Sequence, residues 1–342
     1  MEVATLFVRL EQLEMSEWDD LLPESEFGVF HTSEGLRVLN EYASGDLHLF
    51  GGFNGQQPVA LFPIFIRQKF KFRMALSPPP GFGIRELGPL FFPVSSKQSK
   101  QEKLVEEFSE SIINAVDADS ATTLLRISTG PYYMDPRKFW WAGFDVYPTF
   151  TYQLGLESAV REEILQSFSK SLRRDIRNGM ESDVTIRTVN DTSNLENIYK
   201  SIEKRYKEQQ KNFTLSWAYM RDMVESLGER ARVYVAESAH GDFLSGIVVL
   251  YSNDTAFFWK GGTGRSSHGF SINSLLHWRI IEDIIDGRTE QEINRYDFHT
   301  ANDERIVQYK RKFNPELVPQ YRIESGGIVM TAAKKAYRKI VQ

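Results

Sequence analysis

The sequence predicts an α/β protein (α+β in its segregation of strands) made of two tandem domains, each a mixed β-sheet flanked by helices. Two observations lead to this prediction. Strand-like and helix-like segments alternate along the chain, and the same order of elements, β-α-α-β-β-β-α-β-α-β, recurs in both halves. The 342 residues are enough for two average domains. We therefore expect a first domain at 1–155, a second at 156–324, and a C-terminal helix at 325–342 able to pack back on the first domain.

The first half shows the shared order through short runs of alternating or helix-spaced apolar residues. A stretch rich in proline and glycine, 77–89, is expected to form a long exposed loop. The predicted strands are 4–10, 46–53, 58–66, 87–92, 122–128 and 148–155, and the predicted helices are 16–22, 33–43, 101–116 and 134–141.

The second half shows the same order more clearly. Turns rich in Gly, Asn and Asp separate three consecutive strands, and Asn273 is expected to cap the amphipathic helix that begins beside it. The predicted strands are 184–190, 232–237, 243–252, 255–260, 294–298 and 317–323, and the predicted helices are 194–210, 216–227, 272–287 and 303–312.

The composition excludes several classes of protein. With 41% hydrophobic and 25% charged residues, the chain is neither disordered nor fibrous. No apolar run approaches the roughly 20 residues that span a bilayer, so we expect no transmembrane segment. The absence of cysteine excludes disulfides, thiolate metal sites and cysteine nucleophiles, and it fits a cytoplasmic location. The six histidines show no paired spacing, so no metal site is expected.

The charge of the chain is unevenly distributed. Residues 1–155 hold 13 basic and 20 acidic side chains, and the remainder holds 28 and 26, so the net charges are −7 and +2. A polyanionic ligand is therefore expected on the second half.

Two common catalytic motifs are absent from the glycine-rich stretch 261–269 and its surroundings. The stretch lacks the Gly-Lys-Ser/Thr ending of a phosphate-binding P-loop. Ser271 lies in Gly-Phe-Ser-Ile-Asn, so the second glycine of a nucleophile elbow is missing. These absences exclude P-loop nucleotide hydrolysis and α/β-hydrolase chemistry as readings of this region.

Four motifs in the second half occur in a distinctive order. They are Phe-Trp-Lys-Gly at 258–261, Asn-x-Leu-Leu-x-Trp at 273–278, Tyr-Asp-Phe at 296–298, and Ile-x-x-Tyr-Lys-x-x-Phe at 306–313. Together with the arginine-rich segment 169–177, they resemble the Fem family of tRNA-dependent peptidyltransferases and the wider set of Fem-like tandem-GNAT proteins. The resemblance covers about 160–323 and implies the GNAT acyltransferase fold, whose order of elements the two halves share.

The resemblance implies transfer of an aminoacyl group from aminoacyl-tRNA to an amine of a nucleotide-linked or lipid-linked precursor of the cell envelope. Lys310 corresponds to the family lysine that stabilises the negative carbonyl oxygen during this transfer. Tyr309 and Phe313 would bind the donor, with Tyr309 stacking on the terminal adenine of the tRNA. The alternative is that both rings are core positions and that Lys310 is solvated between them. The resemblance implies no resident cofactor and a transient contact with the membrane surface.

Further residues are candidates for binding phosphate or supporting the site. Arg205 corresponds to a family arginine that contacts substrate phosphates, and Arg37 lies near a family phosphate lysine. Arg173 and Arg177 form a basic helix face that could meet tRNA or precursor phosphates, or simply face solvent. The supporting residues are Tyr296, Asp297 and Asn273, and for Asp297 a structural hydrogen-bonding role is preferred.

Two other functions remain open from the sequence. A CoA-dependent GNAT protein usually carries closely spaced glycines before the helix that follows its fourth strand, and here Gly262, Gly264 and Gly269 have other intervals. Acyl-CoA is therefore the alternative donor rather than the expected one. The third reading is a ligand-binding relative that keeps the cleft without turnover.

Overall fold

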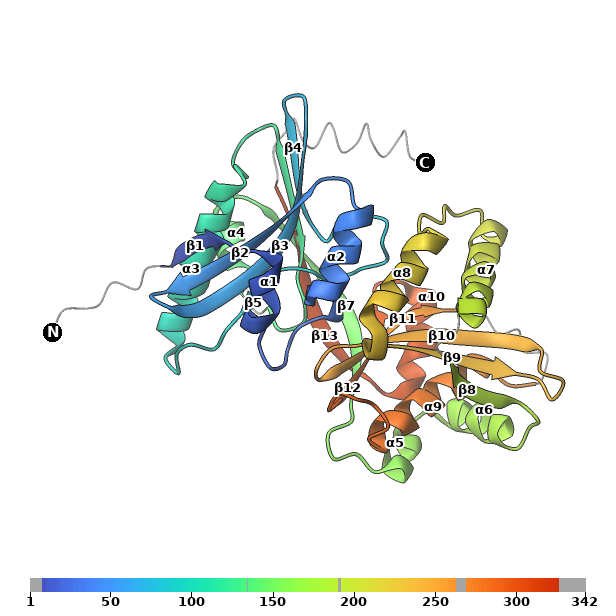
Figure 1. Ribbon diagram of the computed structural model, residues 1–342. Coiled ribbons are helices and arrows are strands. Elements are labelled where there is room, and N and C mark those ends of the chain that lie inside the picture. The colour runs from blue at the N-terminus through green and yellow to red at the C-terminus, as the bar shows by residue number, and fades with distance from the viewer. Residues whose placement is uncertain (1–7, 134, 190–191, 263–268, 326–342) are drawn as a thin grey trace. The chain divides into compact units, whose positions relative to one another are not determined.

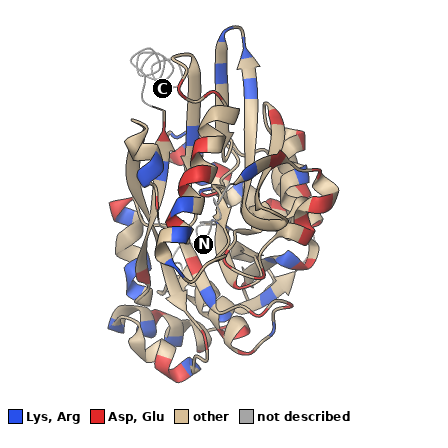
Figure 2. Cartoon of the chain, turned by 90° about the vertical axis from the view of Figure 1, so that its left-hand side faces the viewer, with Lys and Arg blue, Asp and Glu red and all other residues tan. Residues whose placement is uncertain are grey.

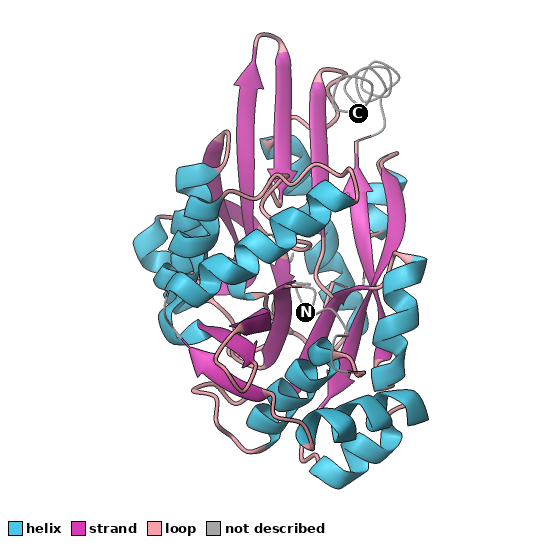
Figure 3. Cartoon of the chain, turned by 90° about the vertical axis from the view of Figure 1, so that its right-hand side faces the viewer, coloured by secondary structure: helices cyan, strands magenta, loops and turns pink. Residues whose placement is uncertain are grey.

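The computed structural model describes residues 8–133, 135–189, 192–262 and 269–325 (Figure 1). The chain forms two compact units, which are treated separately below. Unit 1 comprises Met1–Pro80, Ile84–Thr149 and Pro319–Gln342, and unit 2 comprises Gly81–Gly83 and Phe150–Val318. In each unit, helices lie against a mixed sheet (Figure 3), so the predicted α/β class is confirmed.

The strands of unit 1 follow the order β1-β2-β3-β4-β6-β13, and β5 pairs with β3. Among the described strands of unit 1, β4 and β6 form the parallel pair, and the chain between them includes helix α3. The strands are β1 (Arg9–Gln12), β2 (Asp46–Asn54), β3 (Gln57–Lys69), β4 (Phe72–Ser77), β5 (Leu90–Phe91), β6 (Thr123–Ser128) and β13 (Glu316–Glu324). The helices are α1 (Met15–Trp18), η1 (Asp19–Leu21), η2 (Val29–His31), α2 (Ser33–Tyr42), α3 (Gln98–Ala115) and α4 (Arg137–Trp141).

Unit 2 has the matching order β8-β9-β10-β11-β12-β7. Here β11 and β12 are the parallel pair, and helix α9 connects them. The strands are β7 (Asp145–Gly155), β8 (Thr185–Val189), β9 (Ala231–Glu237), β10 (Phe243–Tyr251), β11 (Thr255–Gly261) and β12 (Arg295–Thr300). The helices are α5 (Arg161–Ser167), α6 (Lys170–Met180), α7 (Thr192–Glu208), α8 (Trp217–Leu227), η3 (Gly228–Arg230), α9 (Ile272–Ile285), α10 (Glu304–Lys310) and η4 (Arg311–Phe313).

The last strand of each half of the sequence completes the sheet of the other half. β7 ends the first half, and its residues from Thr151 to Gly155 pair with β12 of unit 2. β13 ends the second half, and its residues Arg322 to Glu324 pair with β6 of unit 1. The chain thus passes from one unit to the other within each of these strands, whereas the sequence placed the domain limits at 155 and 324.

The elements differ from the predicted ones mainly in unit 1. The sequence predicts no strand at Phe72–Ser77, yet β4 forms there, because β3 and β6 pair with it on its two edges and supply the hydrogen bonds that a short strand cannot provide alone. β5 is shorter than predicted. The helix expected at 325–342 lies outside the described residues except for Ser325.

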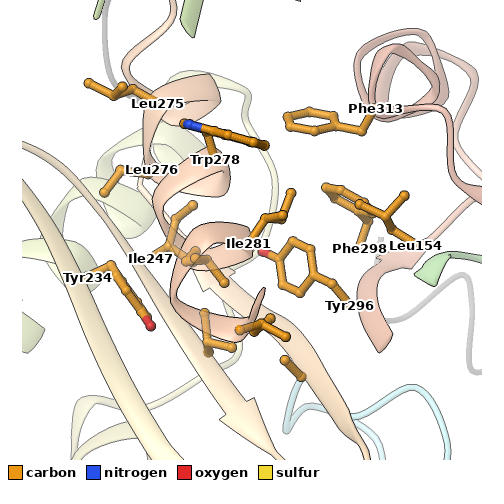
Figure 4. Close-up of a cluster of buried hydrophobic side chains, with 14 of the residues drawn as sticks. Leu154, Tyr234, Ile247, Leu275, Leu276, Trp278, Ile281, Tyr296, Phe298 and Phe313 are labelled. Carbon is orange, nitrogen blue, oxygen red and sulfur yellow. The ribbon is translucent and has the colours of Figure 1, made fainter. Parts of the chain in front are cut away.

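The core of unit 2 is built around α9. Ten of its residues are buried, including Leu276, Trp278 and Ile281, because the helix packs against β9 and β10 and also against α6. Figure 4 shows Trp278, Ile281, Tyr296, Phe298 and Phe313 converging beside this helix. The predicted core positions of Trp259 and Trp278 are confirmed, with 4% and 3% exposure. This packing fixes the strands on either side of the candidate site.

No helix among the described residues is both long enough and apolar enough to cross a bilayer. No cluster of three or more His, Asp or Glu side chains in the same part of the chain has the arrangement of a metal site.

The contact between α7 and β10 gives a test of the packing in unit 2. A Cβ at Gly246 in β10 would lie 2.5 Å from Cδ1 of Ile198 in α7, which is fully buried. We expect Gly246→Ala to lower the free energy of unfolding by about 1–3 kcal/mol, because a well-packed core does not accept an added methyl group without displacement. Denaturant unfolding measures this change.

The control for this prediction is Gly155→Ala in β7, where an added Cβ meets nothing within 4 Å. It should change stability by less than about 1 kcal/mol. The double variant Gly246→Ala/Ile198→Val should recover part of the loss. Equal effects of the two alanine substitutions would contradict the proposed close packing of α7.

Candidate functional site

The parallel strands β11 and β12 separate part-way along their length. Their pairing runs from Thr255 with Arg295 to Phe257 with Asp297 and then ends, although β11 continues to Gly261 and β12 to Thr300. In unit 1 the equivalent strands β4 and β6 stay paired to the last residue of β4. The two strands therefore diverge at one end of the sheet of unit 2, and the space between their ends is called the opening below.

Lys310, the last residue of α10, has its ammonium group at this opening. Its Nζ donates hydrogen bonds to the backbone carbonyls of His299 (3.0 Å) and Thr300 (2.9 Å), at the end of β12. The ring of Phe258, the first residue of β11 beyond the paired segment, lies 5.9 Å from Nζ. Lys310 is only 5% exposed, so the reading of a solvated lysine is wrong.

A bulge in β12 directs the two carbonyls toward Lys310. The register between β12 and β7 shifts between Asp297 and Thr300, and His299 has a left-handed backbone, with φ of 65°. Asp297 supports this conformation because its Oδ1 accepts a hydrogen bond from the backbone amide of His299. The same carboxylate accepts hydrogen bonds from Thr151 Oγ1 (2.6 Å) and Gln153 Nε2 (3.1 Å).

Burial raises the pKa of Asp297, while these hydrogen bonds act in the opposite direction. The carboxylate is held by hydrogen bonds on both oxygens. Asp297 thus holds the end of β12 in the conformation whose carbonyls accept the hydrogen bonds of Lys310.

A buried histidine and a buried tyrosine form the neighbouring wall of the site. The hydroxyl of Tyr296 lies 2.7 Å from Nδ1 of His277, and both side chains are buried. Burial, followed by the charge of Lys310, lowers the pKa of His277 to about 3. His277 is thus neutral at physiological pH, and burial also raises the pKa of the Tyr296 phenol, so the hydrogen bond joins two uncharged groups, with its donor set by the tautomer of the imidazole. A neutral neighbour adds no second positive charge beside Lys310.

Tyr309 and Phe313 differ in their exposure. Tyr309 is half-buried, and its hydroxyl lies 3.4 Å from Ser274 Oγ. Phe313 has no exposed surface and packs on Phe168 and Phe298, with ring centroids 5.3 and 4.8 Å away (Figure 4). The expectation that Phe313 binds the donor is therefore corrected: its ring is part of the core, as the alternative reading had it. A nucleobase could reach Tyr309 only at the part of its ring that is not packed.

Asn273 does not cap α9. Ser271 is the capping residue, because its hydroxyl accepts the amide hydrogen bond of Ser274. The side chain of Asn273 instead accepts a hydrogen bond from Ser245 Oγ (2.7 Å) and donates one to the carbonyl of Gly262 (2.9 Å). Asn273 therefore joins α9 to β10 and to the residue that follows β11. Because Ser271 already caps the helix, the side chain of Asn273 is available for these contacts.

Arg205 lies near the end of α7 beside a second arginine. Burial lowers the pKa of Arg205; the nearby Tyr206 raises it and the charge of Arg305 in α10 lowers it further. Within the described part of the chain, neither arginine forms an ion pair. Arg305 precedes Lys310 by five residues, which is about 7.5 Å along a helix. Two unpaired guanidinium groups of this kind suit a phosphate.

The remaining predicted residues lie elsewhere. Arg177 is exposed on α6, and Arg173 donates a hydrogen bond to the carbonyl of Gln166 (2.9 Å). Arg37 is exposed on α2 in unit 1. Phosphate binding by these three residues stays a prediction. The glycine-rich stretch 261–269 is where a CoA-dependent protein would bind the cofactor, and its residues 263–268 lie outside the described residues. The amide of Gly262 donates a hydrogen bond to the carbonyl of Gly246.

Comparison with known proteins identifies the class of the second half. Residues 166–311 match the family model described as an acetyltransferase (GNAT) domain. This range includes the separated strands, α9, Arg205 and Lys310. This range has the GNAT fold. No curated protein matches the sequence.

Solved structures resemble this chain over nearly its whole length. The structure of FemX has a TM-score of 0.68 at 10% identity and covers 92% of this chain and 96% of its own. The C-terminal domain of a putative lysylphosphatidylglycerol synthetase from Agrobacterium fabrum has a TM-score of 0.54 at 13% identity, covering 94% and 95%. A tandem GNAT protein from the clavulanic acid biosynthesis pathway has a TM-score of 0.51 at 12% identity, covering 93% and 99%. The resemblance to Fem-like tandem-GNAT proteins is thus confirmed in the fold.

His277 is a residue of the candidate site that no sequence motif indicated. The available signal was its position on α9 four residues after Asn273, on a helix whose other buried residues are mostly apolar. A polar ring on such a helix must find a partner, and here the partner is Tyr296.

The neutral state of His277 predicts a pH dependence of stability. The unfolded chain takes up a proton at His277 below pH 6.5, whereas the folded protein does not until about pH 3. Stability should therefore be fully present above pH 6.5 and fall with pH below it, by about 1.4 kcal/mol per pH unit from this residue. Denaturant unfolding between pH 7 and about pH 4.5 measures the slope.

His277→Asn is the matched variant, because its side-chain amide can either accept a hydrogen bond from the Tyr296 hydroxyl or donate one to it. The variant should show a shallower slope than the parent protein, and the difference separates His277 from His31, which is also buried. An imidazole NMR signal of His277 that titrates near 6.5 in the folded protein would contradict the assignment.

Proposed function

We propose that the protein is an N-acyltransferase of the Fem type, which transfers an aminoacyl group from aminoacyl-tRNA to an amine of a nucleotide-linked or lipid-linked envelope precursor. The observation that carries this proposal is the buried ammonium group of Lys310 at the opening between β11 and β12. A fixed cation at the open end of a sheet is suited to a carbonyl oxygen that becomes negative.

The reaction requires attack of the acceptor amine on the ester carbonyl carbon. A carbon–nitrogen bond forms, the carbonyl oxygen takes up negative charge, and the bond to the tRNA ribose oxygen then breaks. The amine loses one proton and the ribose oxygen gains one. In this scheme Lys310 stabilises the negative oxygen, and a preorganised contact of this kind contributes about 3–4 kcal/mol to the lowering of the barrier.

The neighbouring titratable groups support a route without a protein base. Nδ1 of His277 is occupied by the hydroxyl of Tyr296, and both oxygens of Asp297 accept hydrogen bonds. The proton of the amine would then pass to a phosphate oxygen of the substrate or directly to the leaving ribose oxygen. Arg205 and Arg305 would hold such a phosphate on the same unit as Lys310.

Two comparisons support aminoacyl rather than acetyl transfer. The structure with the TM-score of 0.68 is that of FemX, and the name of the Agrobacterium protein denotes joining of a lysyl group to phosphatidylglycerol. An aminoacyl donor also suits the net positive charge of the second half, because tRNA is a polyanion.

A ligand-binding relative without turnover is the second candidate, and one observation favours it. Lys310 is 5% exposed, with Phe258 beside it, so an ester carbonyl can reach the ammonium group only if Phe258 moves. Under this reading the cleft binds its ligand, and no acyl transfer follows.

Replacement of Lys310 tests the catalytic proposal. Lys310→Met keeps most of the aliphatic stem and removes the charge, so transfer should fall by at least about a hundredfold. The measurement is the rate of transfer of a radiolabelled aminoacyl group from tRNA to a muropeptide precursor, with acyl-CoA as the competing donor. Circular dichroism and the midpoint of thermal unfolding show whether the variant remains folded.

Lys312→Met is the matched control, because Lys312 is a lysine two residues further along the chain, in η4. Its rate should equal that of the parent protein. Unchanged turnover in folded Lys310→Met rejects the proposed role of Lys310. Turnover with acyl-CoA alone assigns the alternative donor, and no turnover with either donor, together with retained binding, assigns the ligand-binding function.

Arg205→Met tests the phosphate site. Loss of a charge-assisted hydrogen bond should raise the KM for a phosphate-bearing acceptor by about 10- to 100-fold, with a smaller effect on kcat. Lys204→Met, an exposed neighbour on α7, is the control and should leave KM unchanged. An equal loss of kcat and unchanged KM in Arg205→Met would contradict a binding role.

A further inference from the structure

The strands β3 and β4 extend beyond the sheet of unit 1 as a hairpin. Lys69 pairs with Phe72, so Phe70 and Lys71 form the two-residue turn. On one side β2 pairs with β3 only as far as Ile66, and on the other side β6 pairs with β4 only from Arg73. Residues 67–72 therefore project beyond both neighbouring strands, as Figures 1 and 3 show.

The turn of this hairpin places an aromatic ring in water. Phe70 is 88% exposed and Phe72 is 37% exposed. Phe70 also has a left-handed backbone, with φ of 55°, and Nε2 of Gln68 donates a hydrogen bond to its carbonyl (3.0 Å). Turns of this kind favour Gly or Asn. Neither the turn geometry nor the packing of unit 1 requires a phenylalanine at this position.

The hairpin tip is also strongly basic. Residues 57–77 contain Arg67, Lys69, Lys71 and Arg73 and no acidic residue. Within the described part of the chain, none of these four side chains forms an ion pair, and Figure 2 shows blue basic segments on the projecting hairpin. The nearest strand end carries one carboxylate, Asp46, opposite Ile66.

The cations lie on both faces of the hairpin. Side chains of directly paired residues point to the same face, and successive residues alternate. Arg67 and Lys69 therefore share one face with Phe72, whereas Arg73, which pairs with Gln68, lies on the other. Lys71 is in the turn itself. The exposed ring of Phe70 at the apex therefore has basic side chains on both sides of the hairpin and not on one side alone.

We propose that this hairpin tip, residues 67–73, docks end-on on the surface of an anionic phospholipid membrane. Phe70 enters the boundary between headgroups and acyl chains, and the four cations contact lipid phosphates around it. The inference is independent of the proposed reaction.

The distribution of charge favours a membrane over an RNA. A nucleic acid binds along one face of a hairpin. A hairpin that binds nucleic acid would therefore carry its cations in a row on one face, with the aromatic ring on that same face. Here the cations are on opposite faces and the most exposed ring is at the end. An extended anionic surface that meets the tip head-on can contact all of them together.

The absence of cysteine from the chain permits a direct test of insertion. Phe70→Cys is labelled with an environment-sensitive fluorophore and mixed with vesicles of phosphatidylcholine and phosphatidylglycerol, or of phosphatidylcholine alone. The emission should shift to the blue and increase with the mixed vesicles only. Trp140→Cys is the matched control, because Trp140 is 65% exposed elsewhere in unit 1, and its emission should not change.

Sedimentation of the unlabelled full-length protein with the same vesicles tests the two components of binding. Phe70→Ser should lower the partition coefficient by about tenfold or more, because it removes most of the inserted apolar surface. Lys69→Glu/Lys71→Glu should abolish binding, whereas Lys97→Glu/Lys100→Glu, which reverses two exposed charges elsewhere, should have little effect.

The outcomes separate this proposal from the proposed reaction. Transfer to a water-soluble acceptor should be unchanged in the hairpin variants. Vesicle binding that is equal in all variants, or absent in the parent protein, overturns the proposal. Loss of tRNA binding in the hairpin variants without any vesicle binding also overturns it and assigns the tip to RNA.

Discussion

The site in unit 2 depends on one interaction, the hydrogen bonds from the buried ammonium group of Lys310 to two backbone carbonyls of β12. A buried charge is costly unless strong acceptors surround it. The bulge at Phe298 and His299 provides those acceptors, and Asp297 holds the bulge through the His299 amide. Three features of unit 2 meet at this cation. β11 separates from β12 beside it, α10 ends at it, and its neighbour His277 is neutral. In the described part of unit 1 the equivalent strands β4 and β6 stay paired, so the candidate site lies in unit 2.

Much of the fold was predictable because it depends on patterns within short segments. Alternating and helix-spaced apolar residues predicted most strands and helices, including α9 and α10, and the order of elements predicted the GNAT class. β4 was not predictable in the same way. Its six residues become a strand through pairing with β3 and β6, of which β6 lies some fifty residues further along the chain, and no local pattern carries that information.

The site was predictable in part. The family motifs located Lys310, but its burial depends on a bulge and a register shift that single residues do not indicate. Tyr309 and Phe313 are four residues apart on one helix face, so the sequence could not decide which of them packs in the core. Asn273 and Ser271 are both good capping residues, and the choice between them follows from the tertiary partners of Asn273. His277 has no motif of its own and becomes significant only through Tyr296.

The exchange of β7 and β13 has a consequence for the integrity of the protein. A polypeptide cut between the two halves would give fragments that each lack the final strand of their own sheet and carry an unpaired strand belonging to the other. Such exposed strand edges are prone to aggregate. Neither fragment is therefore expected to be a self-sufficient module, and the second half cannot be expressed alone as a minimal enzyme. Each half therefore needs the other half of the chain in order to complete its sheet.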